Sequence, residues 1–343
     1  MLNVPNIRLL NQQLAAPQFT DPHEVVRWFG FMQGQEQRMM RWAVAMRTKK
    51  PSLKKFTEDY DASRIVRTHL FRCTWQLVCA DDLRWMLSLC GERNRKTVKG
   101  WMAQYGRTVP DEEEYQDARE AIRTILQGRR DITRDDLLHQ MSVMGVKGDE
   151  GRHTAHLYFA ESDGTICSGQ LHPKAKGTYM LVDDFIPPTD IPSREECLAE
   201  LARRYFRSHS PATLEDFVWW TALPQSDCRK AIQSIASELA EYKKYDLTLY
   251  LHQACRTRGC RESYILLPSY DEYLIGYKSR HLVLDEAFAH RAHDKKGIFR
   301  PVILHRGQVV GNWHLKSHET EFFYPEEQTD MTAYLKQYAK AML

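Results

Sequence analysis

Two glutamines separated by one residue, Gln33 and Gln35 in the stretch FMQGQEQRMMRW (31–42), have side chains that could take part in chemistry. A neutral amide is a poor general base, but its carbonyl oxygen can orient a water or face a cation, and its NH₂ group can donate to an oxygen. On a regular helix, residues two positions apart point about 200° apart. The pair therefore favours a turn, in which Gly34 would let the two amides converge.

Three segments carry the same signal for the start of a helix. In each, a capping residue is followed three positions later by an acid and then by two apolar residues: DPHEVV (21–26), TRDDLL (133–138) and TLEDFV (213–218). This is a capping-box pattern, in which the first side chain accepts from an amide of the helix start and the acid reaches back. We therefore expect three helices, each beginning just after its capping residue.

The third segment is predicted to continue into a second helix. Residues 222–224 form a break that ends in proline, and apolar residues then recur at helical spacing up to Leu239. Helix, tight turn and helix make the helix-turn-helix arrangement. The second helix would present three side chains to a DNA groove, namely Arg229, Lys230 and Gln233.

The first segment aligns with the third without a gap. The alignment sets GFMQGQEQRMMRWAV over ALPQSDCRKAIQSIA, which places Gln33 on Gln225 and Gln35 on Asp227. The two amides are therefore expected in the turn, or at the cap, before a second helix. The second segment predicts a helix and a break at Gly145.

Each group of helices is followed by a segment that is predicted to form strands, the first of which is rich in β-branched and aromatic residues. Residues 64–79 and 242–252 are predicted to be strand-like, and residues 151–173 are predicted to form a hairpin that turns at 162–164. Helices followed by a hairpin make a winged helix. The sequence thus predicts three tandem winged-helix units, over residues 1–105, 110–185 and 193–260.

The last part of the chain, residues 261–343, is predicted to be a small antiparallel β unit. Apolar residues alternate there between hairpin turns such as Arg306-Gly307, and residues 329–343 are typical of a closing amphipathic helix. The Pro-rich stretch 184–193 is the expected linker before the third unit. The expected fold class is therefore α+β.

Composition limits the class of protein. The chain has 343 residues, a net charge of +3 and eight cysteines without paired spacing. No apolar stretch approaches the roughly 20 residues of a membrane span, and residues 1–14 carry no signal-peptide core. We therefore expect a protein of a reducing cytoplasm.

Neither a metal nor a cofactor is expected. Cys255-x₄-Cys260 lacks a second pair of ligands, and two His-x₂-His pairs lack partnering acids at a useful spacing. The sequence also contains no P-loop and no G-x-G-x-x-G motif.

Positive charge gathers in the N-terminal third. Between Arg38 and Arg72 the chain has ten Lys and Arg residues and three acids, whereas residues 111–114 are all acidic. Such a track fits a polyanion on one face, although a solvated surface with clustered charges would give the same pattern. The candidate DNA-binding residues in this track are Arg38, Arg41, Lys54, Lys55, Arg67 and Arg72.

Five stretches follow one another along nearly the whole chain: MQGQE (32–36), VRTHLFRCTWQLVCADDLRWML (66–87), SHSPATLEDFVWWTAL (208–223), LLPSYDEYLIGYKSR (266–280) and GIFRPVILHRGQVVGNWH (297–314). In this order they resemble the winged-helix DNA-binding protein family that contains the AlkZ and YcaQ DNA glycosylases. The third and fourth stretches are long, which makes a chance match improbable.

The resemblance implies a specific activity. Glycosylases of this family remove N-alkylated purines, including bulky adducts and interstrand crosslinks joined through the purine N7. Their catalytic signature is glutamine, an aliphatic residue, then glutamine or aspartate, and Gln33 and Gln35 occupy its outer positions. Gly34 departs from the aliphatic middle residue, and Gln76 stands where many relatives have histidine.

For such a substrate a neutral amide could suffice. An N7-alkylated purine already carries positive charge, so its glycosidic bond is weakened and the base leaves without enzymatic protonation. The enzyme must then orient a water and stabilise an oxocarbenium-like sugar. Gln35 is expected to position the water, and Gln33 is expected to orient or contact the sugar.

Other roles are open for these and nearby residues. Both amides could merely satisfy backbone groups of the turn. Glu36 could be the base, since a carboxylate polarises water better than an amide, or it could lie in the first turn of the second helix, turned away. Trp219 and Trp220 are expected in the core. A tertiary polar anchor, without a catalytic role, is expected of Tyr270, Asp271 and Glu272.

The leading hypothesis is a monofunctional DNA glycosylase that hydrolyses the N-glycosidic bond of N7-alkylated purines, with bulky adducts or interstrand crosslinks as candidate lesions. Its partner would be double-stranded DNA containing an alkylated purine, bound by a monomer at the nucleoid of a bacterial cytoplasm, without a membrane. The alternative is a non-enzymatic winged-helix DNA-binding protein or transcription regulator, which would usually dimerise. A degenerate family member without a DNA function is the third hypothesis.

Overall fold

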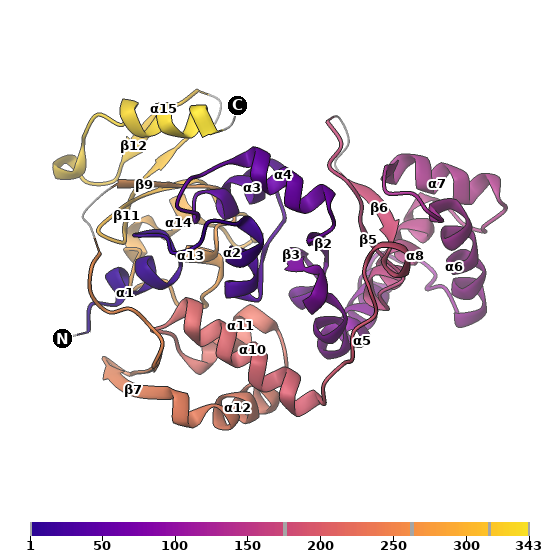
Figure 1. The fold of residues 1–343 in the computed structure, drawn as a ribbon, viewed down its shortest axis with the longest axis horizontal. Coiled ribbons are helices and arrows are strands. Elements are labelled where there is room, and N and C mark those ends of the chain that lie inside the picture. Colours follow the sequence, from indigo (N-terminus) through magenta and orange to yellow (C-terminus); the bar gives the residue numbers. More distant parts are fainter. Residues whose placement is uncertain (1, 174–176, 261–263, 315–316, 342–343) are drawn as a thin grey trace. The chain divides into compact units, whose positions relative to one another are not determined.

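The chain forms two compact units in the computed structural model, which describes residues 2–173, 177–260, 264–314 and 317–341. Unit 1 comprises residues 1–56 and 198–343, and unit 2 comprises residues 57–197. Unit 1 therefore combines the indigo beginning of the chain with its orange and yellow end (Figure 1). These boundaries differ from those of the three winged-helix units, which stay a prediction.

The beginning of unit 1 consists of short helices around one short strand. Its elements are α1 (Val4–Asn11), α2 (Pro22–Phe29), β1 (Phe31–Gln33), α3 (Gln37–Ala45) and α4 (Leu53–Asp61), the last of which runs past the unit boundary. Asp21 precedes α2 and its backbone amide donates to the Glu24 carboxylate over 3.3 Å. The capping box predicted from the sequence is therefore confirmed at this helix.

The chain enters unit 1 again within a long helix. The elements that follow one another here are α10 (Arg194–His209), α11 (Leu214–Thr221), α12 (Gln225–Ser234), β7 (Leu239–Lys244) and β8 (Leu247–His252). The Thr213 hydroxyl accepts from Asp216 N, and the Asp216 carboxylate accepts from Thr213 N, both over 3.0 Å. The predicted break at residues 222–224 is confirmed, with Ala222 at a φ of 51°, and β7 pairs with β8 as a hairpin.

The C-terminal part of unit 1 contains a four-stranded antiparallel sheet. Its strands are ordered β12-β11-β10-β9, with bounds β9 (Tyr264–Leu267), β10 (Val302–His305), β11 (Gln308–Trp313) and β12 (Thr320–Phe322). Arg306 and Gly307, at φ 51° and 77°, turn β10 into β11. Two positive φ values are what a two-residue hairpin loop requires, so the predicted turn is confirmed.

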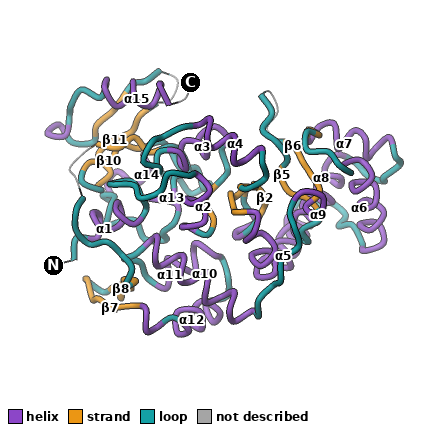
Figure 2. Tube along the Cα trace, viewed as in Figure 1, coloured by secondary structure: helices purple, strands orange, loops and turns teal. Residues whose placement is uncertain are grey.

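Three helices accompany this sheet: α13 (Glu272–Ile275), α14 (Ala289–Ala292) and α15 (Thr332–Ala341). The closing helix predicted near the C-terminus is thus confirmed as α15, and residues 342–343 of that prediction lie outside the described residues. In α15, Tyr338 packs its ring edge-on against Trp313 of β11, with 4.9 Å between centroids. Figure 2 shows α15, in purple, beside the orange strands of the sheet.

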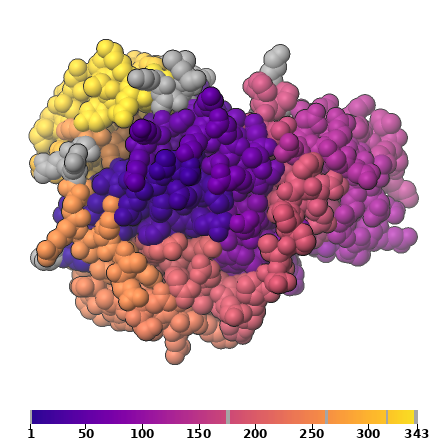
Figure 3. Space-filling model, in the orientation of Figure 1, coloured from indigo at the N-terminus to yellow at the C-terminus, as the bar shows by residue number. Residues whose placement is uncertain are grey.

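The core of unit 1 joins the two distant parts of the chain. Leu9 and Leu10 of α1 are buried in one cluster with Val302 and Leu304 of β10. The space-filling view accordingly shows indigo surface next to orange and yellow surface (Figure 3). Burial of apolar side chains is the main driving force for folding, so neither part of unit 1 completes its core alone.

Unit 2 is mainly helical, with small antiparallel pairings. Its elements are β2 (Ile65–His69), β3 (Trp75–Cys79), α5 (Ala80–Gln104), α6 (Glu112–Leu126), β4 (Ile132–Thr133), α7 (Arg134–Val143), α8 (Glu150–Ser162), β5 (Ile166–Ser168), β6 (Thr178–Leu181) and α9 (Val182–Phe185). Residues 64–79 pair as the β2–β3 hairpin. Thr133 caps α7 by accepting from Asp136 N over 3.2 Å, and Gly145 follows that helix, both as predicted.

The predicted hairpin over residues 151–173 is wrong. Residues 150–162 form α8, whose N-cap Asp149 accepts from Arg152 N over 2.9 Å. Four buried residues recur at helical spacing on one face, namely His153, His156, Leu157 and Ala160. The turn signal at residues 162–164 suggested a hairpin, but this period decides for a helix, and Gly164, at φ 76°, follows its end.

The element types fit the α+β fold class, because helices accompany small antiparallel sheets in both units. Within the described ranges, none of the helices is both long enough and apolar enough to cross a membrane.

Candidate active-site turn

The segment that contains Gln33 and Gln35 connects two helices of unit 1. Gly30 follows α2 with a φ of 90°, β1 ends at Gln33, and α3 begins after its N-cap, Glu36. The left-handed conformation at Gly30 is one that glycine adopts without a steric penalty. Gln35 lies in the turn before α3, as predicted, whereas Gln33 is the last residue of strand β1 and not part of the turn.

The two glutamines have different surroundings. Gln33 is only 5% exposed, whereas Gln35 is exposed. Gln35 therefore lies at the surface, while Gln33 is held within the protein. This difference separates two side chains that the sequence presents as equivalent.

Glu272 holds the backbone of Gln33. The Gln33 amide donates to Glu272 Oε1 over 2.6 Å, and Glu272, the first residue of α13, is 1% exposed. A buried carboxylate is costly unless hydrogen-bond donors surround it. Its second oxygen accepts from Trp220 Nε1 over 3.2 Å and lies 3.4 Å from His209 Nε2. Donors from three separate segments therefore converge on one side chain.

Aromatic packing closes this network. The Phe31 ring stacks on Trp220 with 3.7 Å between centroids. Burial lowers the pKa of His209 below its ordinary value, so the imidazole is neutral near pH 7. A neutral ring can donate Nε2–H to Glu272 while Nδ1 accepts from the Ser208 hydroxyl, 2.8 Å away. Strand β1 is thus held at Phe31 by stacking and at Gln33 by a backbone hydrogen bond.

A second buried carboxylate secures the far end of α3. Arg47, two residues beyond α3, donates to both oxygens of Asp271 over 2.9 and 2.7 Å. Both side chains are buried, and a bidentate Arg–carboxylate pair has well-defined geometry. The anchor predicted from the sequence is confirmed at Asp271 and Glu272, while Tyr270 packs half-buried against a core cluster.

Sequence reasoning did not connect Glu272 with the candidate amides. The two residues of this hydrogen bond are 239 positions apart. Local patterns such as caps and turns cannot identify a partner at that separation. The signal available was only that Asp271 and Glu272 are acids within an otherwise apolar stretch.

Glu36 uses its carboxylate to cap α3. Its side chain accepts from Met39 N over 2.7 Å and from Arg38 N over 3.3 Å. This arrangement satisfies amides of the helix start and places negative charge at the positive end of the helix. The contacts favour the capping role over a role as general base.

The basic candidates in the N-terminal part of unit 1 lie on two helices. On α3, Arg38 is exposed and Arg41 is half-buried; on α4, Lys54 is exposed. Lys55, also on α4, forms an ion pair with Asp21. Arg38 and Arg41 are three residues apart, so they share one side of the helix that begins after the candidate turn.

The candidates of unit 2 lie on or between β2 and β3. Arg67 is buried, with its guanidinium 4.0 Å from the ring centroid of Trp75. Arg72 is half-buried at a φ of 61°, in the connection between the strands. Gln76 is buried and donates from Nε2 to Phe71 O over 2.9 Å. These contacts give Arg67 and Gln76 packing roles within the hairpin.

The three candidates on α12, Arg229, Lys230 and Gln233, are all exposed. Of the neighbouring tryptophans, Trp220 is fully buried, as predicted, but the prediction for Trp219 is wrong. Trp219 is 39% exposed and donates from Nε1 to Ile275 O over 2.9 Å. On α11 the two adjacent positions point to different sides, and only one faces the core.

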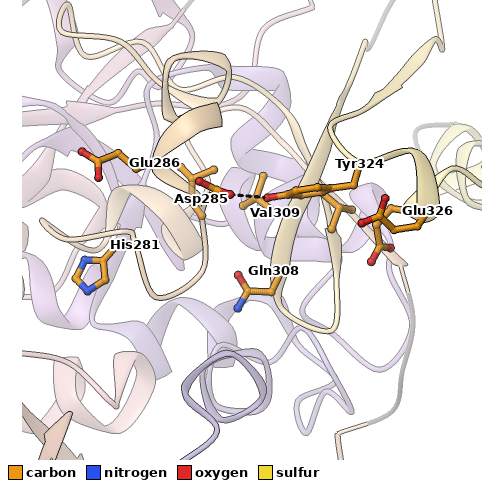
Figure 4. A pocket seen from close by; sticks show the side chains of 10 residues that line it. His281, Asp285, Glu286, Gln308, Val309, Tyr324 and Glu326 are labelled. Atoms are coloured by element: carbon orange, nitrogen blue, oxygen red, sulfur yellow. Dashed lines mark hydrogen bonds between the residues drawn. The ribbon is translucent and has the colours of Figure 1, made fainter. Parts of the chain in front are cut away.

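Unit 1 also has a depression of about 560 Å³, which neither Gln33 nor Gln35 lines (Figure 4). Its lining includes Asp285, Glu286, Glu326 and Glu327, and the Tyr324 hydroxyl donates to Asp285 Oδ2 over 3.1 Å. None of the sequence-predicted site residues belongs to this lining. Clustered carboxylates repel phosphates, so this depression is unsuited to nucleic acid. In the described part of the chain, no group of three or more His, Cys, Asp and Glu side chains is arranged to hold a metal ion.

Comparison with known proteins assigns the family. Residues 26–325 match the family model described as DNA glycosylase AlkZ-like. The class is therefore that of DNA glycosylases, DNA-repair enzymes that bind DNA, and the chain belongs to the AlkZ-like family. The resemblance inferred from the sequence is confirmed.

A solved structure shows the same fold. The DNA glycosylase AlkZ of Streptomyces sahachiroi superposes with a TM-score of 0.80 at 21% sequence identity, over 99% of this chain and 95% of that chain. No curated protein matches the sequence significantly.

Proposed function

We propose that this chain hydrolyses the N-glycosidic bond of N7-alkylated purines in double-stranded DNA, with bulky adducts or interstrand crosslinks among its substrates. The observation that carries the proposal is the surface position of Gln35 two residues after Gln33, whose backbone amide donates to a buried carboxylate. Membership of the AlkZ-like family supports the glycosylase class.

Two amides meet the limited demands of this reaction. In an N7-alkylated purine the leaving base takes both electrons of the C1′–N9 bond and becomes neutral, so no acid is needed. Gln35 orients a water through its carbonyl oxygen, and the water oxygen bonds to C1′ while a proton passes to solvent. Gln33 orients its neighbour and the sugar. Because water completes the reaction, the enzyme is monofunctional.

The DNA backbone is bound by the basic residues of α3 and α4. Arg38 and Arg41 follow the candidate turn directly, so they hold phosphates near Gln35, and Lys54 extends this track. On α12, exposed Arg229 supports a further contact with the duplex. The remaining candidates, proposed as weaker contributors or as packing residues, are Lys55, Arg67, Arg72, Lys230 and Gln233.

A single-turnover excision assay tests the proposal. Duplexes with one N7-methylguanine, or with an N7-linked crosslink, are incubated with excess wild type, Gln33→Ala or Gln35→Ala. Gln225→Ala, which removes the exposed amide that aligns with Gln33, is the matched control. We expect abasic product from the wild type and the control, and a rate constant about 100-fold lower for Gln35→Ala at unchanged DNA affinity.

Other outcomes separate the competing functions. Wild type that binds plain duplex tightly but releases no base from either substrate would contradict the enzyme and favour the DNA-binding regulator. Sedimentation of the DNA complex at the mass of one chain per duplex supports the proposed monomer. Excision of N7-methylguanine without unhooking of the crosslink would restrict the substrate to small adducts.

A further inference from the structure

The burial of the Glu272 carboxylate costs folding free energy. Glu272 is 1% exposed, and burying a carboxylate is unfavourable unless its hydrogen bonds compensate fully. Donor nitrogens near its carboxylate include Gln33 N at 2.6 Å, Trp220 Nε1 at 3.2 Å and His209 Nε2 at 3.4 Å. The shortest of these contacts is made to the backbone of the candidate turn.

Glycine at position 34 explains why this backbone needs an anchor. Glycine populates more backbone conformations than other residues, so it weakens the relation between the two flanking side chains. The segment is fixed on both sides by carboxylates, with Glu272 on Gln33 N and Glu36 on Met39 N. Gly34 and Gln35 therefore lie between two anchored points.

We propose that Glu272 is a positioning residue of this enzyme. It acts through the peptide amide of Gln33 and holds the turn in the conformation that directs the Gln35 amide to the water and the sugar. The inference rests on the proposed glycosylase function. Its effect is on orientation, and a group held out of place by about 1 Å can lower a rate about 100-fold.

The test compares Glu272→Gln with a matched buried carboxylate. Asp216 is also 1% exposed, and its oxygens accept from backbone amides of residues 213, 278 and 279 and not from those of residues 31–35. Asp216→Asn therefore controls for the loss of a buried charge in the same unit. Both variants are assayed at a temperature where circular dichroism shows them folded.

We expect Glu272→Gln to lower the single-turnover excision rate constant about 10- to 100-fold while the Kd for lesion DNA changes less than about two-fold. Asp216→Asn is expected to keep the rate constant within about two-fold. In the Gln35→Ala background the Glu272→Gln effect should disappear, since both changes remove the same oriented amide. A purely structural role would leave the two losses multiplicative, which would overturn the inference.

Amide hydrogen exchange gives a readout that does not depend on catalysis. Exchange in a peptide that covers residues 31–36 is expected to accelerate in Glu272→Gln and to stay unchanged in Asp216→Asn. Unchanged exchange, or an excision rate equal to that of wild type, would overturn the role of Glu272 while leaving the glycosylase proposal intact. Wild type without excision would instead overturn the proposed function itself.

Discussion

Two buried histidine–glutamate pairs occupy the two units, and they differ in their connections. In unit 1, His209 lies beside Glu272, which also accepts from the Gln33 backbone and from an indole. In unit 2, His69 Nδ1 lies 2.7 Å from Glu161, whose other oxygen has no hydrogen-bond partner among the described residues. Both carboxylate oxygens of Glu272 have hydrogen-bond partners, whereas only one oxygen of Glu161 has a partner among the described residues.

The surroundings of the two pairs explain the difference. Trp75 and Tyr158 pack against the His69 ring, at 3.9 and 4.4 Å between centroids, and so enclose that pair within aromatic packing. The unit 1 pair instead links segments that are far apart in the chain to the candidate turn. A buried carboxylate with a histidine neighbour is poor evidence of stability by itself, and the segments that it connects decide its role. The comparison teaches that Glu272 connects the core to the proposed site, whereas Glu161 lies within a core.

The largest expected effect comes from the carboxylate next to Glu272. Asp271→Ala would leave the Arg47 guanidinium buried without its partner, which costs about 3–5 kcal/mol of unfolding free energy. Urea unfolding followed by tryptophan fluorescence measures the loss. The control is Glu321→Ala, which breaks an exposed pair with Arg291 and should cost less than about 1 kcal/mol. Equal losses for the two variants would show that the unit 1 network is not a stabilising anchor.

Acid is expected to act on unit 2 through His156. This residue is fully buried, neither ring nitrogen has a hydrogen-bond partner among the described residues, and burial lowers its pKa from 6.5 to about 4. The unfolded chain therefore binds more protons between those two values, so the free energy of unfolding falls as the pH decreases through that window. The full shift corresponds to about 3 kcal/mol.

Unfolding midpoints in urea from pH 7 to pH 4 measure this dependence. His156→Leu should flatten it, and the exposed His139→Leu should not. The His156 ring also faces Glu114, which raises its pKa, and His153 and Arg152, which lower it. An unchanged pH dependence in His156→Leu would assign acid sensitivity to other groups, such as buried His209.

Replacing Glu272 or Glu161 with glutamine tests the difference between the two histidine–glutamate pairs directly. Glu272→Gln replaces charge-assisted hydrogen bonds from several donors and should cost about 2 kcal/mol at pH 7. Glu161→Gln keeps an oxygen for His69 and removes a partly unsatisfied charge, so it should cost less than about 1 kcal/mol. Urea unfolding of both variants measures the two losses of unfolding free energy. A larger loss for Glu161→Gln than for Glu272→Gln would refute the distinction between the pairs.

The smallest expected effect concerns helix caps that occur in both units. Thr133→Ala removes a half-buried cap of α7 and should cost about 1 kcal/mol, whereas Thr213→Ala removes a buried cap of α11 and should cost up to about 2 kcal/mol. Thr124→Ala, an exposed position on α6, should change stability by less than about 0.5 kcal/mol. Thermal unfolding of the three variants ranks them.

Local patterns predicted much of the secondary structure. The caps at Asp21, Thr133 and Thr213, the break before α12 and the Arg306-Gly307 turn all depend on neighbouring residues, so the sequence contains the information that forms them. The failure at residues 150–162 has a local cause as well. The turn signal at residues 162–164 suggested a hairpin, while the apolar period and the Asp149 cap favour the helix that forms.

The candidate site was predictable only in part. Gln33 and Gln35 were identified by spacing and by resemblance, and the repeat predicted the place of Gln35 before α3 but not that of Gln33 in strand β1. Their unequal exposure was not predictable, because it depends on packing against α11 and α13. The same holds for Trp219 and Trp220, which are adjacent in sequence but only one of which reaches the core.

The sequence by itself therefore determined the helix starts, the turns, the pair of amides and the family. The tertiary structure alone decided that residues 1–56 and 198–343 fold together, and that Glu272 meets the backbone of Gln33 across 239 positions. The physical reason is the range of the interactions. Caps and turns form between residues a few positions apart, whereas a buried carboxylate takes whichever donors the completed core brings to it.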